Sequence, residues 1–181
     1  YLANKEPEKA AAVYLSVIEL VPQRVSAYAN LARIYGFQNK PEQQEGVYRQ
    51  GIAANPDNIG LRLALSNIYQ NQGQNEKALV LLEEAHELDK TSPAVINNLA
   101  MVLMDSYPTE ENLQRVQIMT RGFESMDNPG LLDTVGWLQY LLGNAQQAIS
   151  LSLGGFAVTA GHGEMAKAKE FIDKGDDYSS I

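Results

Sequence analysis

Residues 31–35 are Leu-Ala-Arg-Ile-Tyr, and similar pentads return at residues 65–69 (Leu-Ser-Asn-Ile-Tyr) and 99–103 (Leu-Ala-Met-Val-Leu). The pentads are 34 residues apart, and each has a large apolar residue, then a small residue, then a second large residue at helical spacing. The small residue lets a neighbouring helix approach closely, while the large residues fill the space beside it. A fixed period of this length predicts a helical repeat protein.

Turn signals outside the pentads divide each period into two helices. Gly73 and Gly143 follow the first helices of their units, where a left-handed residue is needed to end a helix. Ala78 and Ala148 then lie where we expect the second helix to make its close contact. Pro56 ends a second helix before the next unit begins. The sequence therefore predicts consecutive helix–turn–helix units.

A 34-residue helix–turn–helix period with these residue types resembles the tetratricopeptide repeat (TPR). The resemblance implies an all-α fold, a right-handed superhelical solenoid of antiparallel helix pairs. We expect one array over residues 1–181. It comprises the second helix of a partial repeat (1–22), three repeats (23–56, 57–90 and 91–128) and irregular C-terminal repeats or a cap (129–181).

Two segments depart from the period. Residues 105–111 predict a longer turn between the helices of the third repeat. Residues 153–156, Leu-Gly-Gly-Phe, are poor helix formers. Two similar helix starts, at Gly143 and Gly163, are 20 residues apart, which is 14 short of the period. Either the last repeat is a collapsed cap or about one helix is missing between Leu151 and Gly163, and we favour the second interpretation.

Composition and motifs argue against several function classes. The formal net charge of −8 disfavours nucleic acid as a partner, because phosphate binding needs clustered Lys and Arg. The chain has no cysteine, and no apolar run reaches the length of a membrane span, so we expect no direct membrane insertion. His86 and His162 are the only histidines, and no metal, nucleophile or phosphate-binding motif surrounds them. We expect no catalytic site, cofactor or metal.

In TPR proteins the first helices line a concave surface, so the resemblance implies a partner-binding groove on those helices. Amide side chains there can hydrogen-bond a peptide backbone, and methionine and aromatic side chains can anchor it. The alternative is that Met101, Trp137 and Tyr140 pack between the repeats. The expected groove residues are Arg33, Asn67, Asn97, Asn98, Met101, Met104, Asp133, Trp137 and Tyr140.

The resemblance also raises the carboxylate clamp that grips the C-termini of heat-shock chaperones. Asn67 and Asn98 occupy the clamp's asparagine positions. Leu63, Gly130 and Thr134 occupy the positions of its basic residues. Two asparagines cannot neutralise a terminal carboxylate, so we do not expect that ligand.

We therefore expect a protein–protein interaction scaffold that binds a peptide or flexible segment, as part of a larger bacterial assembly. The alternatives are a structural module that stacks on a neighbouring domain or self-associates through open repeat ends, and a repeat region attached to a catalytic domain. Residues 97–100, 131–137 and 175–178 resemble the C-terminal repeats of bacterial TPR proteins associated with exopolysaccharide export and exosortase-type sorting. That resemblance implies a secretion role and favours the periplasm or envelope over the cytoplasm.

Overall fold

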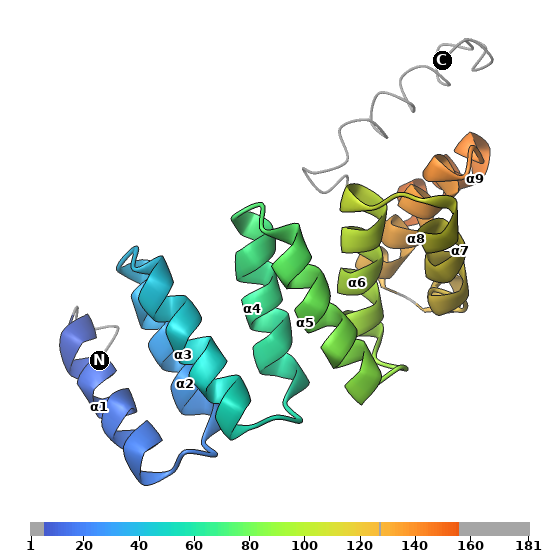
Figure 1. The fold of residues 1–181 in the computed structure, drawn as a ribbon. Helices are drawn as coiled ribbons and strands as arrows, with labels where there is room; N and C mark the ends of the chain where they lie inside the picture. The colour runs from blue at the N-terminus through green and yellow to red at the C-terminus, as the bar shows by residue number, and fades with distance from the viewer. Residues whose placement is uncertain (1–5, 127, 156–181) are drawn as a thin grey trace. The chain divides into compact units, whose positions relative to one another are not determined.

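The computed structural model describes residues 6–126 and 128–155, and this part of the chain is entirely helical, without strands (Figure 1). The predicted all-α class is confirmed. In the same residues no helix combines the length and the apolar character needed to cross a membrane.

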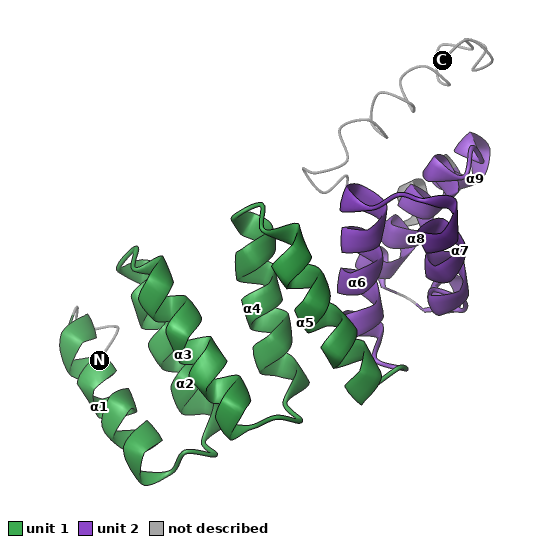
Figure 2. Ribbon diagram, in the orientation of Figure 1, with its two compact units in different colours: residues 1–90 green, residues 91–181 purple. Residues whose placement is uncertain are grey.

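The helices alternate between first and second helices of successive pairs. Helix α1 (Pro7–Leu20) precedes the pairs α2 (Val25–Phe37) with α3 (Pro41–Ala54), α4 (Ile59–Asn71) with α5 (Asn75–Leu88), α6 (Pro93–Ser106) with α7 (Glu110–Met119), and α8 (Pro129–Leu141) with α9 (Ala145–Gly155). A 3-10 helix, η2 (Phe123–Ser125), follows α7. The chain divides into two compact units, residues 1–90 with α1 to α5 and residues 91–181 with α6 to α9 (Figure 2).

Unit 1 is held together by the residues that the 34-residue period singled out. Leu31, Ala32, Leu65 and Ser66 are all buried in its interior. Gly51 of α3 lies so close to the core that an added Cβ would lie 2.9 Å from Cγ of Tyr28. The small residues therefore set how closely the helices approach one another, as the sequence predicts.

Three of the four turns between paired helices, those after α2, α4 and α8, share one conformation. Asn39, Gly73 and Gly143 have φ values of 54°, 70° and 82°, which confirms the predicted left-handed residue after the first helices α4 and α8. The next residue's N–H donates in each case to the carbonyl oxygen five residues earlier, as from Gln74 to Tyr69 at 2.8 Å. This bond satisfies a carbonyl at the helix end that would otherwise lack a partner.

Unit 2 departs from the predicted third repeat. The expected longer turn after α6 is wrong, because the connection of residues 107–109 has three residues, as many as residues 38–40 and 72–74. One extra residue lies in α6, which has 14 residues where α2 and α4 have 13. A longer connection follows α7, which has 10 residues where α3 and α5 have 14 each. Gly122, at φ 96°, turns the chain into η2, and Phe123 enters the unit 2 core.

Helix α9 continues through Gly155, so residues 153–155 are helical, contrary to the prediction. Packing explains the difference: Ala148 is buried and Leu151 packs against the unit 2 core. Such contacts outweigh the cost of two glycines at a helix end, about 1 kcal/mol each. The second predicted helix start at Gly163 and the segment 175–178 lie outside the described residues. The predicted repeat boundaries and the missing helix remain predictions.

Candidate functional site

In three of the four helix pairs the first helix carries fewer charged residues than the second. Helices α2, α4, α6 and α8 each carry one charged residue, whereas α3, α5 and α7 carry three to five and α9 carries none. The accessible polar side chains of the first helices are mainly amides. A surface of this kind offers hydrogen bonds without demanding a charged partner.

In unit 1 the first-helix surface presents the two predicted residues in exposed positions. Arg33 of α2 is exposed, and its Nη2 donates to Oδ1 of Asn30, 3.1 Å away. Asn67 of α4 is exposed, as is Asn71 one helical turn later. Both amides of α4 are therefore accessible to a partner.

In unit 2 four of the predicted residues meet along the line where α6 and α8 contact one another. The Thr134 hydroxyl donates to Oδ1 of Asn97 at 2.6 Å and lies 3.7 Å from Sδ of Met101. Trp137 Nε1 donates to Oδ1 of Asp105 at 2.9 Å. We name this set (Asn97, Met101, Asp105, Thr134, Trp137 and Tyr140) the α6–α8 seam.

The two aromatic rings of the seam stack on one another, and the Tyr140 ring is more accessible than the Trp137 ring. The rings of Trp137 and Tyr140 stack at a centroid distance of 5.2 Å with planes 12° apart. Trp137 is only 9% exposed, whereas Tyr140 is half-buried. Most of the Trp137 surface is therefore packed between helices, as the alternative interpretation expects. Tyr140 is the ring of the pair that a partner can reach.

Two predicted groove residues are not accessible in the structure. Met104 is 1% exposed and Asp133 is 8% exposed, so both serve packing. Asn98 is half-buried, and its Nδ2 donates to its own helix at the carbonyl of Ala94, 2.7 Å away. Asp105, one helical turn after Met101, was also expected in the groove, but the predicted groove set did not include Thr134. The sequence signal that could have identified Thr134 is its position one helical turn before Trp137.

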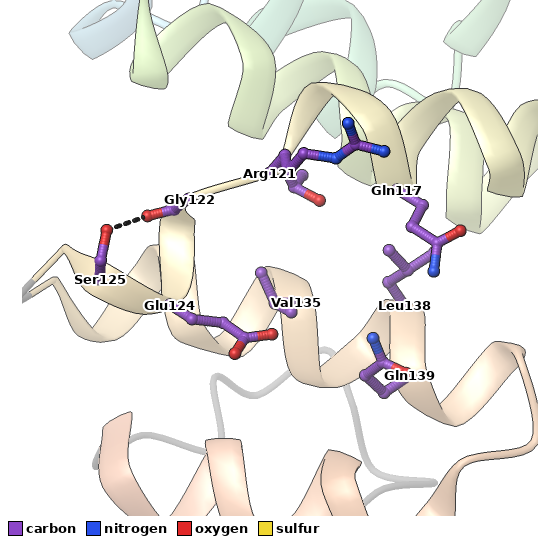
Figure 3. Close-up of a pocket in the computed structure, with 9 residues that line it drawn as sticks. Gln117, Arg121, Gly122, Glu124, Ser125, Val135, Leu138 and Gln139 are labelled. Atoms are coloured by element: carbon purple, nitrogen blue, oxygen red, sulfur yellow. Dashed lines mark hydrogen bonds between the residues drawn. The ribbon is translucent and has the colours of Figure 1, made fainter.

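Two hollows lie apart from the α6–α8 seam. In unit 1 a cavity of about 360 Å³ includes Arg49, Tyr69 and Lys77 in its lining. Burial raises the pKa of Tyr69, which is partly offset by the hydrogen bonds that Arg49 donates to its hydroxyl. In unit 2 a cavity of about 550 Å³ lies between the end of α7, η2 and α8 (Figure 3).

The described residues contain no group of three or more His, Asp or Glu side chains that could hold a metal ion. His86 is half-buried on α5, in agreement with the packed or half-exposed position expected from the sequence. His162 lies outside the described residues.

Residues 25–58 and residues 60–88 each match a family model described as the tetratricopeptide repeat. No curated protein matches the sequence. The chain therefore contains at least two repeats of this type, one over the pair α2 and α3 and one over the pair α4 and α5.

Solved structures, a TPR protein among them, resemble this fold over most of the chain. YrrB, described as a TPR protein with an unusual peptide-binding site, is 19% identical, with 93% of this chain and 86% of that chain covered and a TM-score of 0.64. The protein pilF of Pseudomonas aeruginosa is 22% identical, with 96% and 81% covered and a TM-score of 0.66. MamA is 13% identical, with 95% and 94% covered and a TM-score of 0.60. These similarities establish a TPR-type solenoid fold.

Proposed function

We propose that this chain is an interaction scaffold whose first-helix surfaces bind a peptide or flexible segment of a partner protein. The observation that carries the proposal is the contrast between the amide-bearing first helices, with one charged residue each, and the charged second helices α3, α5 and α7. Amides can donate to and accept from a peptide backbone in any sequence. The partner is therefore recognised through its backbone and a few apolar side chains.

The α6–α8 seam supplies the apolar contacts in this proposal. The indole of Trp137 is held by Asp105, so the stacked Tyr140 ring rests on a support that is already in place. Met101 is half-buried, with its Sδ 3.7 Å from the Thr134 hydroxyl, and can adapt to different side chains. Preorganised aromatic anchors lose little side-chain entropy when a partner binds.

Site-specific photocrosslinking tests this proposal. A photoreactive residue replaces Asn67 on α4, and the control chain carries it at the exposed Gln50 of α3. Because Asn67 lies on the proposed surface, we expect a bacterial lysate to yield one crosslinked segment from position 67 and none from position 50. The segment is identified by mass spectrometry.

Substitutions then locate the binding energy. Tyr140→Ala should weaken binding of the identified segment by roughly tenfold or more, as expected for loss of an aromatic anchor. Ile118→Ala, which removes an exposed apolar side chain from α7, is the matched control and should leave binding unchanged. Equal crosslinking from positions 50 and 67, or equal effects of the two substitutions, would place the binding surface elsewhere.

An assembly role is the second candidate, because α1 exposes several aliphatic side chains. Val13, Leu15 and Leu20 are 47%, 43% and 81% exposed. If α1 mediates self-association, light scattering should give twice the monomer mass at micromolar concentration, and Leu20→Asp should restore the monomer. The bacterial envelope and export setting is part of the proposal and is supported by the resemblance of residues 97–100 and 131–137.

A further inference from the structure

The shortening of α7 creates the cavity in unit 2. Helices α3 and α5 have 14 residues, and their last turns pack Gly51 and Ala85 into the interior. Helix α7 ends after 10 residues, and Gly122 turns the chain away at φ 96°. A hollow of about 550 Å³ lies between this end of α7, η2 and α8 (Figure 3).

Hydrogen-bond donors gather around this hollow. Gln139 of α8 is only 8% exposed, and its Oε1 already accepts from Asn144 at 2.9 Å. Its amide nitrogen has no partner among the described side chains, and Figure 3 shows it directed into the hollow. Gln117 extends into the same space from α7, and the exposed guanidinium of Arg121 lies at its rim.

The remaining lining limits what these donors can hold. Val135 and Leu138 form an apolar floor, and Glu124 lines the side next to η2. Within residues 6–126 and 128–155, neither Arg121 nor Glu124 forms an ion pair, so among these residues no opposite charge competes with a ligand for them. One guanidinium and one carboxylate give no net charge, which disfavours a dianion such as phosphate and suits a single carboxylate.

We propose that the cavity between α7, η2 and α8 binds an α-carboxylate next to an aliphatic side chain. Arg121, Gln117 and Gln139 donate to the carboxylate, the floor receives the aliphatic side chain, and Glu124 accepts from the N–H of the same ligand residue. The chemistry is shared by a free acylated amino acid and by the C-terminus of a polypeptide. The cavity lies outside the α6–α8 seam, and this inference does not depend on the function proposed above.

The test titrates the full chain with three probes. These are N-acetyl-leucine, the peptide acetyl-Gly-Ser-Gly-Ser-Val-Leu with a free carboxylate, and the same peptide as its C-terminal amide. Binding is followed by calorimetry and by the side-chain amide NMR signals of Gln117 and Gln139. We expect both carboxylates to bind and to shift these signals, and the amide to bind about tenfold more weakly or worse. A peptide that binds much more tightly than N-acetyl-leucine would identify a polypeptide C-terminus as the source.

Two substitutions locate the site. Arg121→Gln should weaken carboxylate binding about tenfold, whereas Arg24→Gln, the same change at an exposed residue of unit 1, should have no effect. Gln139→Glu keeps an oxygen for Asn144 while replacing the donor, so it should abolish binding in a folded chain. Tyr140→Ala should leave this binding unchanged. Equal affinity for acid and amide, unchanged binding in Arg121→Gln, or no response to any probe would overturn the proposal.

Discussion

Tyr28 is 1% exposed, and its hydroxyl donates to the carbonyl oxygen of Pro22 at 2.9 Å. This bond fixes the start of α2 against the turn that follows α1. Tyr28→Phe keeps the ring but leaves the carbonyl of Pro22 without its donor, so we expect a loss of about 1 kcal/mol in the free energy of unfolding. Urea denaturation measures the change. Tyr14→Phe, at a half-buried tyrosine for which no such bond is seen, should change stability by far less, and equal losses would contradict the assignment.

At the same scale, the sequence predicted residue types better than residue partners. The single tryptophan was expected to matter, and Trp137 does lie at the contact of α6 and α8. Its partner Asp105 could not be deduced, because the contact between these two residues, 32 positions apart, depends on the extra residue in α6 and on the longer connection after α7. Met104 is buried for a related reason, since exposure is decided by which neighbouring side chains cover a position and not by helical register alone.

At the scale of elements, the turn after each first helix supports a prediction with two matched sites. Asn39 and Gly73 occupy equivalent turns with φ values of 54° and 70°. An added Cβ at Gly73 meets no atom within 4 Å, so Gly73→Ala strains only the backbone and should cost about 1 kcal/mol of the free energy of unfolding.

The second site provides the control for this argument. Asn39→Ala should cost about as much as Gly73→Ala, whereas Asn39→Gly should be neutral to within about 0.5 kcal/mol, because relief of strain offsets added freedom in the unfolded chain. Thermal and urea unfolding of the three variants provide the comparison. A stabilising Gly73→Ala would show that the left-handed conformation is not maintained in solution.

The helices and turns were predictable where the 34-residue pattern of residue types repeats. They were not predictable where that pattern is irregular. The glycine turns and the buried alanines Ala78 and Ala148 follow from the period and were confirmed. The longer connection in the third repeat was predicted between its two helices, but it follows the second of them, α7. Residues 105–111 suggested a longer turn, but Thr109 accepts from the N–H of Asn112 at 3.2 Å and begins α7 directly. The cavity that follows from a shortened α7 has no signature in the sequence beyond Gly122.

For the whole molecule, the period predicted the all-α fold because each repeat packs mainly on its neighbours, so local spacing determines the architecture. The same locality prevents the sequence from naming a partner: the residues that maintain the repeat are the buried ones, and the exposed ones are free to vary. Leu31 and Leu65 identify the fold, while Arg33 and Asn67 beside them only suggest a surface.

Because each repeat packs mainly on its neighbours, we also expect alkaline pH to change the stability of the two units differently. Burial raises the pKa values of Tyr28, Tyr48 and Tyr69 above the ordinary 10.0, and all three lie in unit 1. A tyrosine with a raised pKa in the folded state contributes stability that is complete below its unfolded pKa. That contribution is lost as the pH rises through the folded pKa. Stability should therefore be constant from neutral pH to about pH 9 and fall above about pH 10.

Urea titrations from about pH 8 to about pH 11 test this expectation with two signals. Helical circular dichroism reports the whole chain, and fluorescence of the single Trp137 reports unit 2. The circular dichroism midpoint should fall first, because the destabilised repeats are those of unit 1. Tyr28→Phe removes one of the titrating groups and should therefore reduce the alkaline loss, even though it lowers stability at neutral pH. A midpoint that is independent of pH up to about 11 would show that these hydroxyls are not buried as the structure places them.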